Sequence, residues 1–507
     1  MKQNISRTRH SIINIFFGVL NQILIIVLGF VSRTIFLKFL NDSYLGINGL
    51  FTEVISMLSL ADLGLATVMT YSFFEPLSKK DYQKISRLTN FYEKLYTGIA
   101  VIVASVGVLL IPFLKYIVNL EQGVDNLYLY YLLFLAKTVV SYLFVYKTSI
   151  LNADQNNYIV SRISIYIRIL TVVGQVVILA ITRSYFLYLG LDLFTTWLNN
   201  YLCAKKADQL YPFLDKKLKL EKEEKKEIIN NIKSGFLYKL SGVLLNSTDN
   251  TLISIIIGTI TVGYYSNYSM IFTRIQSLVN TFYASLNGSL GNLIATEEKE
   301  KRYEIFSILQ MIGFISSTLI IVCCYTLIDD FVSLWIGAKY VLSKDVIIAC
   351  VINLYLSIVL QPLWAYRDAT GLFRKTKYVM LLTAVVNLVL SIILGNIYGL
   401  SGIIIASAIS RLVTYVWYEP VVLYKEYFGV GVHKFFLKQG YNILVVIIIC
   451  FVVNVLFGSI ECVNWGTLFL KGIAVFLTTA LLSVMLFCWS KDLKKTIVFI
   501  KERIMRK

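Results

Sequence analysis

The sequence contains little charge: 15% of its 507 residues are charged, whereas 57% are hydrophobic and the mean hydropathy is +0.70. This composition excludes a set of soluble domains, which would carry far more charged residues. The apolar residues form continuous runs, which excludes the alternating pattern of an outer-membrane barrel. A bilayer-spanning helix needs about 20 mostly apolar residues, so about fourteen helices would use nearly all of them. The composition therefore predicts an all-α polytopic membrane protein.

Motifs for common catalytic chemistry are also absent. The two histidines, His10 and His433, lie in segments predicted to be cytoplasmic, and the seven cysteines show no CxxC or Cys/His spacing. No disulfide framework, metal site or cofactor is therefore expected. The chain has no GxxxxGK[ST] motif, so transport would depend on an ion gradient or a downhill substrate rather than on ATP hydrolysis at a P-loop.

The apolar runs define the expected organisation. They predict about fourteen spans, near residues 13–38, 44–68, 90–114, 127–149, 158–181, 184–204, 234–258, 264–292, 304–328, 346–366, 376–397, 400–423, 438–459 and 464–489. The longest polar stretch separates the first six spans from the rest, and many transporters consist of two equivalent halves. We therefore expect an N-terminal six-helix lobe over 1–204, a charged cytoplasmic linker over 205–233, a second six-helix lobe over 234–424, two further helices over 425–490 and a basic cytoplasmic tail over 491–507.

Two short segments give faint support for an internal repeat. YLGINGLF begins at Tyr44 after the first span, and VGYYSNYS begins at Val262 after the seventh. Each is a short outside turn with a glycine that opens the next helix. Aligning Gly46 with Gly263 places Glu53 and Arg274 on the same face of corresponding helices, one turn apart and with opposite charge.

The positive charge is unevenly distributed. The chain has 48 Lys and Arg against 30 Asp and Glu, a net charge of +18. With the N-terminus inside, most of the 48 fall in inside segments and their flanks, and the outside loops and flanks hold Lys38, Lys115, Arg183, Lys339 and Lys344. The positive-inside rule explains this asymmetry. The net charge therefore indicates orientation, with both termini cytoplasmic, and no nucleic-acid partner is expected.

Several ionisable residues fall at membrane depth, where they are costly and usually face a bundle interior or a wet cavity. The first candidates for substrate binding are Arg33, Glu53 and Arg274. Further candidates are Lys137, Arg168, Lys239, Asp249 and Arg411. Positive charges outnumber negative ones at this depth, which favours an anionic ligand, and the bidentate arginine fork suits phosphate.

The alternative interpretation of these charges is structural. The same side chains could form satisfied ion pairs, which is the expectation for Asp62 and Asp192, whereas Lys94, Glu419 and Lys471 are expected to snorkel to an interface. Pro362 and Pro420 each remove a helical hydrogen bond inside a predicted span and permit a bend.

The chain resembles the polysaccharide transport family of oligosaccharide flippases, the Wzx-like branch of the multidrug/oligosaccharidyl-lipid/polysaccharide exporter superfamily. The resemblance covers nearly the whole chain. It is carried by the basic N-terminus before the first span, by YLGINGLF from Tyr44, and by three further segments: LADLGLATVMTYSF from Leu60, STDNTLIS from Ser247 and VGYYSNYSMI from Val262.

This resemblance implies two six-helix lobes and two extra helices that use alternating access. The implied substrate is a polyprenyl-diphosphate-linked oligosaccharide, moved from the inner to the outer leaflet of the bacterial cytoplasmic membrane for surface polysaccharide assembly. In related flippases cationic residues on spans 1, 2 and 8 line the cavity. Arg33 and Arg274 match that placement, whereas Glu53 supplies an acid where some relatives have a base.

Three hypotheses follow from the sequence. In the flippase, Arg33 and Arg274 neutralise the diphosphate, Glu53 holds Arg274 when the site is empty, and the lipid tail stays among membrane lipids. Proton or sodium is the expected coupling ion, and the resemblance allows a glycan polymerase as a partner. The alternative is a cation-coupled multidrug exporter of the same superfamily with Glu53 or Asp249 as the ion-binding carboxylate. A membrane enzyme using Asp329 and Asp330 is disfavoured by the short outside loops.

Overall fold

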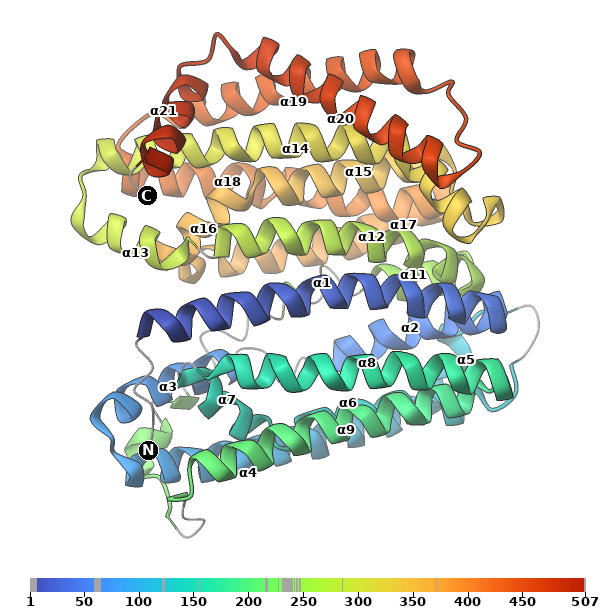
Figure 1. Ribbon diagram of the computed structural model, residues 1–507, viewed down its shortest axis with the longest axis vertical. Coiled ribbons are helices and arrows are strands. Elements are labelled where there is room, and N and C mark those ends of the chain that lie inside the picture. The colour runs from blue at the N-terminus through green and yellow to red at the C-terminus, as the bar shows by residue number, and fades with distance from the viewer. Residues whose placement is uncertain are drawn as a thin grey trace. The chain divides into compact units, whose positions relative to one another are not determined.

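The computed structural model describes residues 7–58, 65–120, 124–154, 156–214, 218–226, 228–229, 240, 242, 245, 248–284, 286–370 and 372–505. These residues are overwhelmingly helical, and no strand occurs among them. Contacts divide the chain into two compact units, Met1–Gly263 and Tyr264–Lys507 (Figure 1). Each unit is described by itself below.

The first unit consists of helices that mostly run as long antiparallel neighbours. Its helices are α1 (Arg7–Phe39), α2 (Asp42–Leu58), α3 (Leu65–Lys79), α4 (Tyr82–Leu109), α5 (Leu114–Ile117), α6 (Leu127–Tyr142), α7 (Val145–Ala153), α8 (Asn157–Thr182), α9 (Tyr185–Leu210) and α11 (Asp249–Ile256). Within this unit α1 packs along α8, and α9 packs along both α8 and α6.

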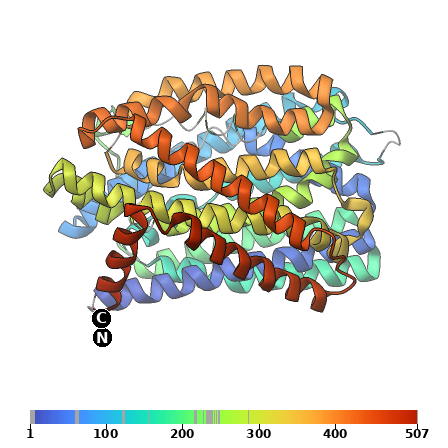
Figure 2. The same cartoon turned by 90° about the horizontal axis from the view of Figure 1, so that it is seen from above.

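The second unit contains most of α12 (Thr259–Ala284) and the helices that follow it. These are α13 (Asn287–Thr296), α14 (Lys299–Ile336), α15 (Lys344–Val359), α16 (Gln361–Thr370), α17 (Phe373–Val413), α18 (Tyr415–Leu423), α19 (His433–Phe457), α20 (Trp465–Phe487) and α21 (Lys491–Met505). The long helix α14 packs against α15, α19, α20 and α21. Figure 2 shows that α21 turns away from the direction of α20 where the two meet.

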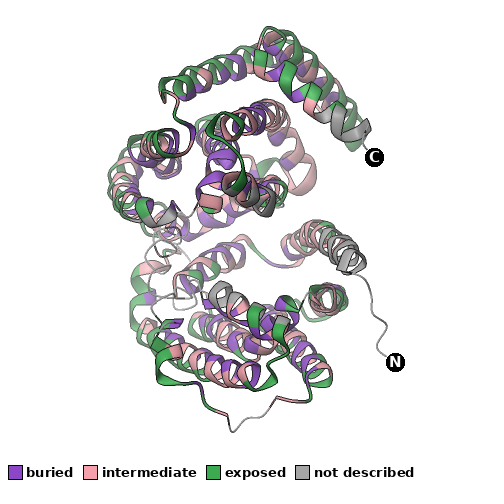
Figure 3. Ribbon diagram, turned by 90° about the vertical axis from the view of Figure 1, so that its left-hand side faces the viewer, coloured by how far each residue is buried: buried purple, intermediate pink, exposed green. Residues whose placement is uncertain are grey.

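The predicted fold class, an all-α polytopic membrane protein, is confirmed. Seven helices in the described part of the chain are long and apolar enough to cross a membrane, or nine if each of two bent pairs is one span. One of the seven, Tyr378–Phe428, covers 51 residues and is interrupted by the non-helical backbone of Gly399, so it contains two of the predicted spans. Large apolar side chains remain exposed along these helices, as expected for a lipid-facing surface. Figure 3 shows exposed residues along the helices of each unit.

The predicted bend at Pro362 is also observed. The helices α15 and α16 meet at an angle of 42°, and Pro362 is the second residue of α16. Proline is tolerated in the first turn of a helix, because a backbone N–H at that position would have no intrahelical partner. Pro420 lies inside α18, which continues directly into a π-helix over Tyr424–Phe428.

The two glycines aligned in the sequence lie in direct contact. A Cβ atom on Gly46 would come within 2.1 Å of the Thr259 carbonyl oxygen, and one on Gly263 would come within 2.9 Å of the Gly46 nitrogen. Reciprocal bonds between Asn119 and Thr259 hold the same region: Thr259 N–H donates to the Asn119 carbonyl over 2.8 Å, and Asn119 N–H donates to Thr259 Oγ1 over 2.9 Å. Only glycine fits at this crossing.

The predicted linker over 205–233 begins as a continuation of α9, which runs to Leu210. Its described residues beyond that point return to α4, where Asn90 Nδ2 donates to the Leu218 carbonyl over 2.8 Å and Arg87 pairs with Glu221 at 3.3 Å. The first part of the predicted seventh span lies largely outside the described residues. The proposed division into two six-helix lobes and two extra helices therefore stays a prediction.

Candidate functional site

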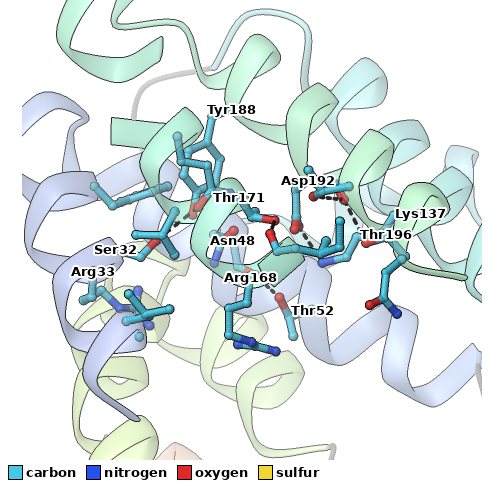
Figure 4. A pocket seen from close by; sticks show the side chains of 18 of the residues that line it. Ser32, Arg33, Asn48, Thr52, Lys137, Arg168, Thr171, Tyr188, Asp192 and Thr196 are labelled. Atoms are coloured by element: carbon cyan, nitrogen blue, oxygen red, sulfur yellow. Dashed lines mark hydrogen bonds and ion pairs between the residues drawn. The ribbon is translucent and has the colours of Figure 1, made fainter. Parts of the chain in front are cut away.

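A polar cavity of about 510 Å³ lies within the first unit. It is lined by side chains from α1, α2, α6, α8 and α9, namely Leu28, Gly29, Ser32, Arg33, Phe36, Asn48, Thr52, Phe134, Lys137, Ser164, Ile167, Arg168, Thr171, Val172, Gln175, Tyr188, Asp192, Thr195, Thr196 and Asn199. Its volume falls in the range of sites for small ligands or ligand headgroups. Figure 4 shows most of these side chains, which extend from several different helices.

The helical period explains why so many polar side chains meet here. Along α8 the lining residues Ser164, Arg168, Thr171 and Gln175 recur every three or four positions, so they share one face of the helix. The lining residues of α9 follow the same spacing. A polar stripe on a membrane helix is stable only when it faces protein or a wet cavity, and these two stripes do so.

Two arginines reach the cavity from different helices. Arg33 comes from α1 and Arg168 from α8, and these helices pack along each other (Figure 4). The sequence singled out both residues by their depth, and the structure brings them to one cavity. Their guanidinium groups supply the planar, forked donors that recognise phosphate or carboxylate.

The third cation of the cavity forms an ion pair. Lys137 Nζ on α6 lies 2.5 Å from Asp192 Oδ2 on α9, and the side chains are 39% and 26% exposed. The prediction that Asp192 forms an ion pair is therefore confirmed, although Asp192 also lines the cavity. Three cationic side chains face one carboxylate, so the cavity has a formal excess of two positive charges.

Aromatic and uncharged polar groups also line the cavity. Tyr188 packs edge-on against Phe36 with ring centroids 5.4 Å apart, and Tyr185 behind it donates its hydroxyl to Asn48 Oδ1 over 3.4 Å. Beside them Ser32 Oγ donates to Gln175 Oε1 over 3.4 Å. These groups offer hydrogen-bond partners without adding charge.

The two acidic candidates, Glu53 and Asp249, do not line this cavity. They lie on α2 and α11, which pack together, and the two carboxylates are close enough to interact electrostatically. Glu53 Oε2 is buried and has no hydrogen-bond partner among the residues that the structure describes. The structure therefore groups the acids with each other and the first-unit cations with the cavity.

The other sequence candidates fall outside this unit or outside the described chain. Arg274 lies on α12 and Arg411 in the last turn of α17, both in the second unit. Lys239 and Asp62 lie outside the described residues.

Two interface assignments made from the sequence are wrong. Glu419 is 2% exposed and its Oε1 accepts a bond from Arg367 Nη1 over 3.1 Å. The Lys471 side chain is 3% exposed and its Nζ lies 2.7 Å from Asp330 Oδ2. Both predicted spans end near an interface, which suggested snorkelling, but a partner on a neighbouring helix holds each charge inside the protein.

Comparison with solved structures identifies the fold. The lipid II flippase MurJ in an inward closed conformation matches with a TM-score of 0.67 and 15% identity over 93% of this chain and 99% of that one. An inward-facing multidrug resistance MATE family transporter of the MOP superfamily matches with a TM-score of 0.59 and 15% identity, over 79% of this chain and 96% of that one. The chain has the fold of this exporter superfamily. At about 15% identity these matches show a shared fold, the polytopic helical fold that the resemblance implies.

A third solved structure, the Vibrio cholerae MATE transporter VcmN in the bent form, matches with a TM-score of 0.51 and 14% identity over 80% of this chain and 93% of that one. No family model matches the sequence, and no curated protein matches it. The matched structures are transporters and flippases rather than enzymes. The protein is therefore a multi-pass membrane protein with a transporter fold.

Proposed function

We propose that this protein is a flippase that moves a polyprenyl-diphosphate-linked oligosaccharide from the inner to the outer leaflet of the bacterial cytoplasmic membrane by alternating access, with both termini cytoplasmic. The observation that carries the proposal is the positively charged cavity of the first unit, where Arg33, Arg168 and Lys137 outnumber Asp192. The fold match to the lipid II flippase supports it.

The physical requirement is to move phosphate charge through a medium that does not solvate it. An unpaired charge at the bilayer centre costs several kcal/mol or more, so the diphosphate must be neutralised before it crosses. Arg33 and Arg168 are positioned to take the phosphate oxygens in bidentate bonds. The hydrophobic tail remains among membrane lipids throughout.

The charge of Lys137 is paired when the cavity is empty and can pair with the substrate when it is occupied. Without substrate it pairs with Asp192, and a bound phosphate would compete for the same ammonium. Because both side chains are partly exposed, the pair contributes only about 0–1 kcal/mol, so a phosphate can replace Asp192 as the partner of Lys137 at little cost in free energy. We extend the proposal to Arg274, Lys239 and Arg411 as further cations on the substrate route.

The Glu53 and Asp249 pair is the proposed ion-coupling element. The two carboxylates lie on helices that pack together, and neighbouring negative charges at membrane depth are costly unless a proton or a sodium ion is taken up. A glycan polymerase that receives the product is a proposed partner.

The test is mass spectrometry of lipid-linked intermediates in cells depleted of the protein, with an external glycosidase to report the leaflet. A completed diphosphate-linked repeat should accumulate on the cytoplasmic side. Re-expression of Arg33→Gln or Arg168→Gln should fail to clear it, because each loses a charged bond worth about 1.5–3 kcal/mol, or about 10- to 150-fold in affinity.

Arg162→Gln is the matched control. Arg162 lies on the same helix as Arg168, rests over the Tyr166 ring at 5.9 Å and does not line the cavity. It should restore export. Full export by both cavity variants would refute the assignment of the cavity.

The second candidate is a cation-coupled multidrug exporter, which the acidic pair and the MATE fold match favour. Its substrates would be cations. An unchanged lipid-linked pool together with increased sensitivity to cationic drugs on depletion would place this function first.

A further inference from the structure

The second unit contains its own polar cavity, of about 350 Å³, between α12 and α16. One wall is a stripe on α12 that consists of Thr273, Gln276, Ser277 and Asn280, spaced one to three residues apart. These four side chains are all uncharged, and each can both donate and accept hydrogen bonds. A stripe of this kind on a membrane helix marks a surface that meets something polar.

The opposite wall is formed by the bend at Pro362. The 42° turn between α15 and α16 directs Gln361, Trp364, Ala365 and Asp368 of α16 to the cavity. An indole ring therefore stands opposite the amide and hydroxyl groups of α12.

A glycine supports this arrangement from behind. A Cβ atom on Gly313 of α14 would lie 3.2 Å from the Tyr283 hydroxyl and 3.4 Å from Pro362. Its absence lets α12 and the start of α16 pack closely on α14, and the Tyr283 hydroxyl donates to the Leu309 carbonyl over 3.1 Å. The cavity is thus held by buried contacts on both of its walls.

The charged groups of this cavity form ion pairs with one another or with Glu419. Arg367 Nε lies 3.1 Å from Asp368 Oδ1, and its Nη1 lies 3.1 Å from Glu419 Oε1. One guanidinium therefore bridges two carboxylates, and the cavity lacks the cationic excess of the site in the first unit. The Arg367 guanidinium also lies over the Trp364 ring, 5.9 Å from its centroid. The groups that remain for a ligand are amides, hydroxyls and the part of the Trp364 indole that lines the cavity.

We propose that the cavity between α12 and α16 is a carbohydrate subsite that takes an uncharged sugar unit of the glycan. Sugars present dense hydroxyl groups on a ring with apolar faces, which matches amides and hydroxyls opposite an indole. A site built to hydrogen-bond hydroxyl groups discriminates strongly against ligands that lack them. The inference rests on the proposed function, since it assigns the sugars of the flippase substrate to this cavity.

The experiment uses the full-length protein, fluorescently labelled in nanodiscs, on an array of neutral bacterial oligosaccharides. Gln276→Leu and Asn280→Leu should each weaken binding at least about tenfold, because they leave sugar hydroxyls unpaired. Ala284→Trp should have the same effect by filling the cavity without removing a polar group. Thr281→Leu is the matched control, since Thr281 is exposed on the same helix but does not line the cavity.

Inorganic pyrophosphate, titrated calorimetrically into the same preparations, provides the second readout. The α12 variants should bind it as the wild type does, which also shows that they are folded. Sugar binding without pyrophosphate binding in the wild type would reject the anion site of the proposed function and keep the carbohydrate subsite.

Three results would overturn the subsite: no neutral glycan bound by the wild type, glycan binding unchanged in all three cavity variants, or tetraphenylphosphonium bound and lost in the same variants. The last result would identify a site for cations.

Discussion

The bond between Arg367 and Glu419 provides a strict test of the second unit. The side chain of Arg367 on α16 is 9% exposed and that of Glu419 on α18 is 2% exposed. Arg367 Nη1 lies 3.1 Å from Glu419 Oε1. Arg367→Met would leave the Glu419 carboxylate buried without a cation. Such a change costs about 3–5 kcal/mol, or about two to three and a half powers of ten in the unfolding equilibrium.

The reverse change should cost less. In Glu419→Gln, Arg367 keeps its bond to Asp368 and the amide oxygen still accepts a hydrogen bond, so we expect about 1–2 kcal/mol. The double variant Arg367→Met/Glu419→Leu removes both charges and should be more stable than Arg367→Met alone, because no uncompensated charge remains.

The assay is equilibrium unfolding in mixed micelles with increasing dodecyl sulfate, followed by circular dichroism. Lys375→Met is the matched control, because Lys375 and Glu426 lie 2.7 Å apart but are 58% and 34% exposed, and such a pair is worth less than about 1 kcal/mol. Equal effects of Arg367→Met and Lys375→Met, or additive costs in the double variant, would refute the reasoning.

Two further predictions concern packing and orientation. Gly46→Val should impair folding or function, because its Cβ would collide with the Thr259 carbonyl. Gly98→Val should be tolerated, because there is open space around Gly98. Comparison of protein yield and transport for the two variants checks this prediction. In single-cysteine variants of intact cells a membrane-impermeant maleimide should label Cys462 and not Cys488, and the opposite result would invert the proposed topology. Burial and a neighbouring carboxylate raise the pKa of the Cys462 thiol, so its labelling should be slow at neutral pH. As the pH is raised towards that pKa, the labelling rate should increase about tenfold per pH unit, because the thiolate is the reactive form.

The sequence located the cations of the first cavity without defining the cavity. Arg33, Lys137 and Arg168 stood out because a charge inside an apolar run is costly. Their assembly depends on the rotation of α1, α6 and α8 about their axes. That rotation is set by packing between helices that are distant in the chain.

The second cavity was missed for a different reason. Gln276, Asn280 and Trp364 are uncharged, so a search for ionisable residues at membrane depth passes over them. The spacing of polar residues along α12 was a signal that could have located one wall. The other wall depends on the bend at Pro362, whose direction the sequence does not encode.

The sequence by itself determined the fold class and the broken helix at Pro362, because apolar runs and proline act on the chain locally. Only the tertiary structure decided which charges meet. Glu419 and Lys471 are held inside the protein by Arg367 and Asp330, each on a different helix. Whether a charge near a helix end turns to water or inward depends on such a partner, and partners are chosen by packing rather than by neighbours in sequence.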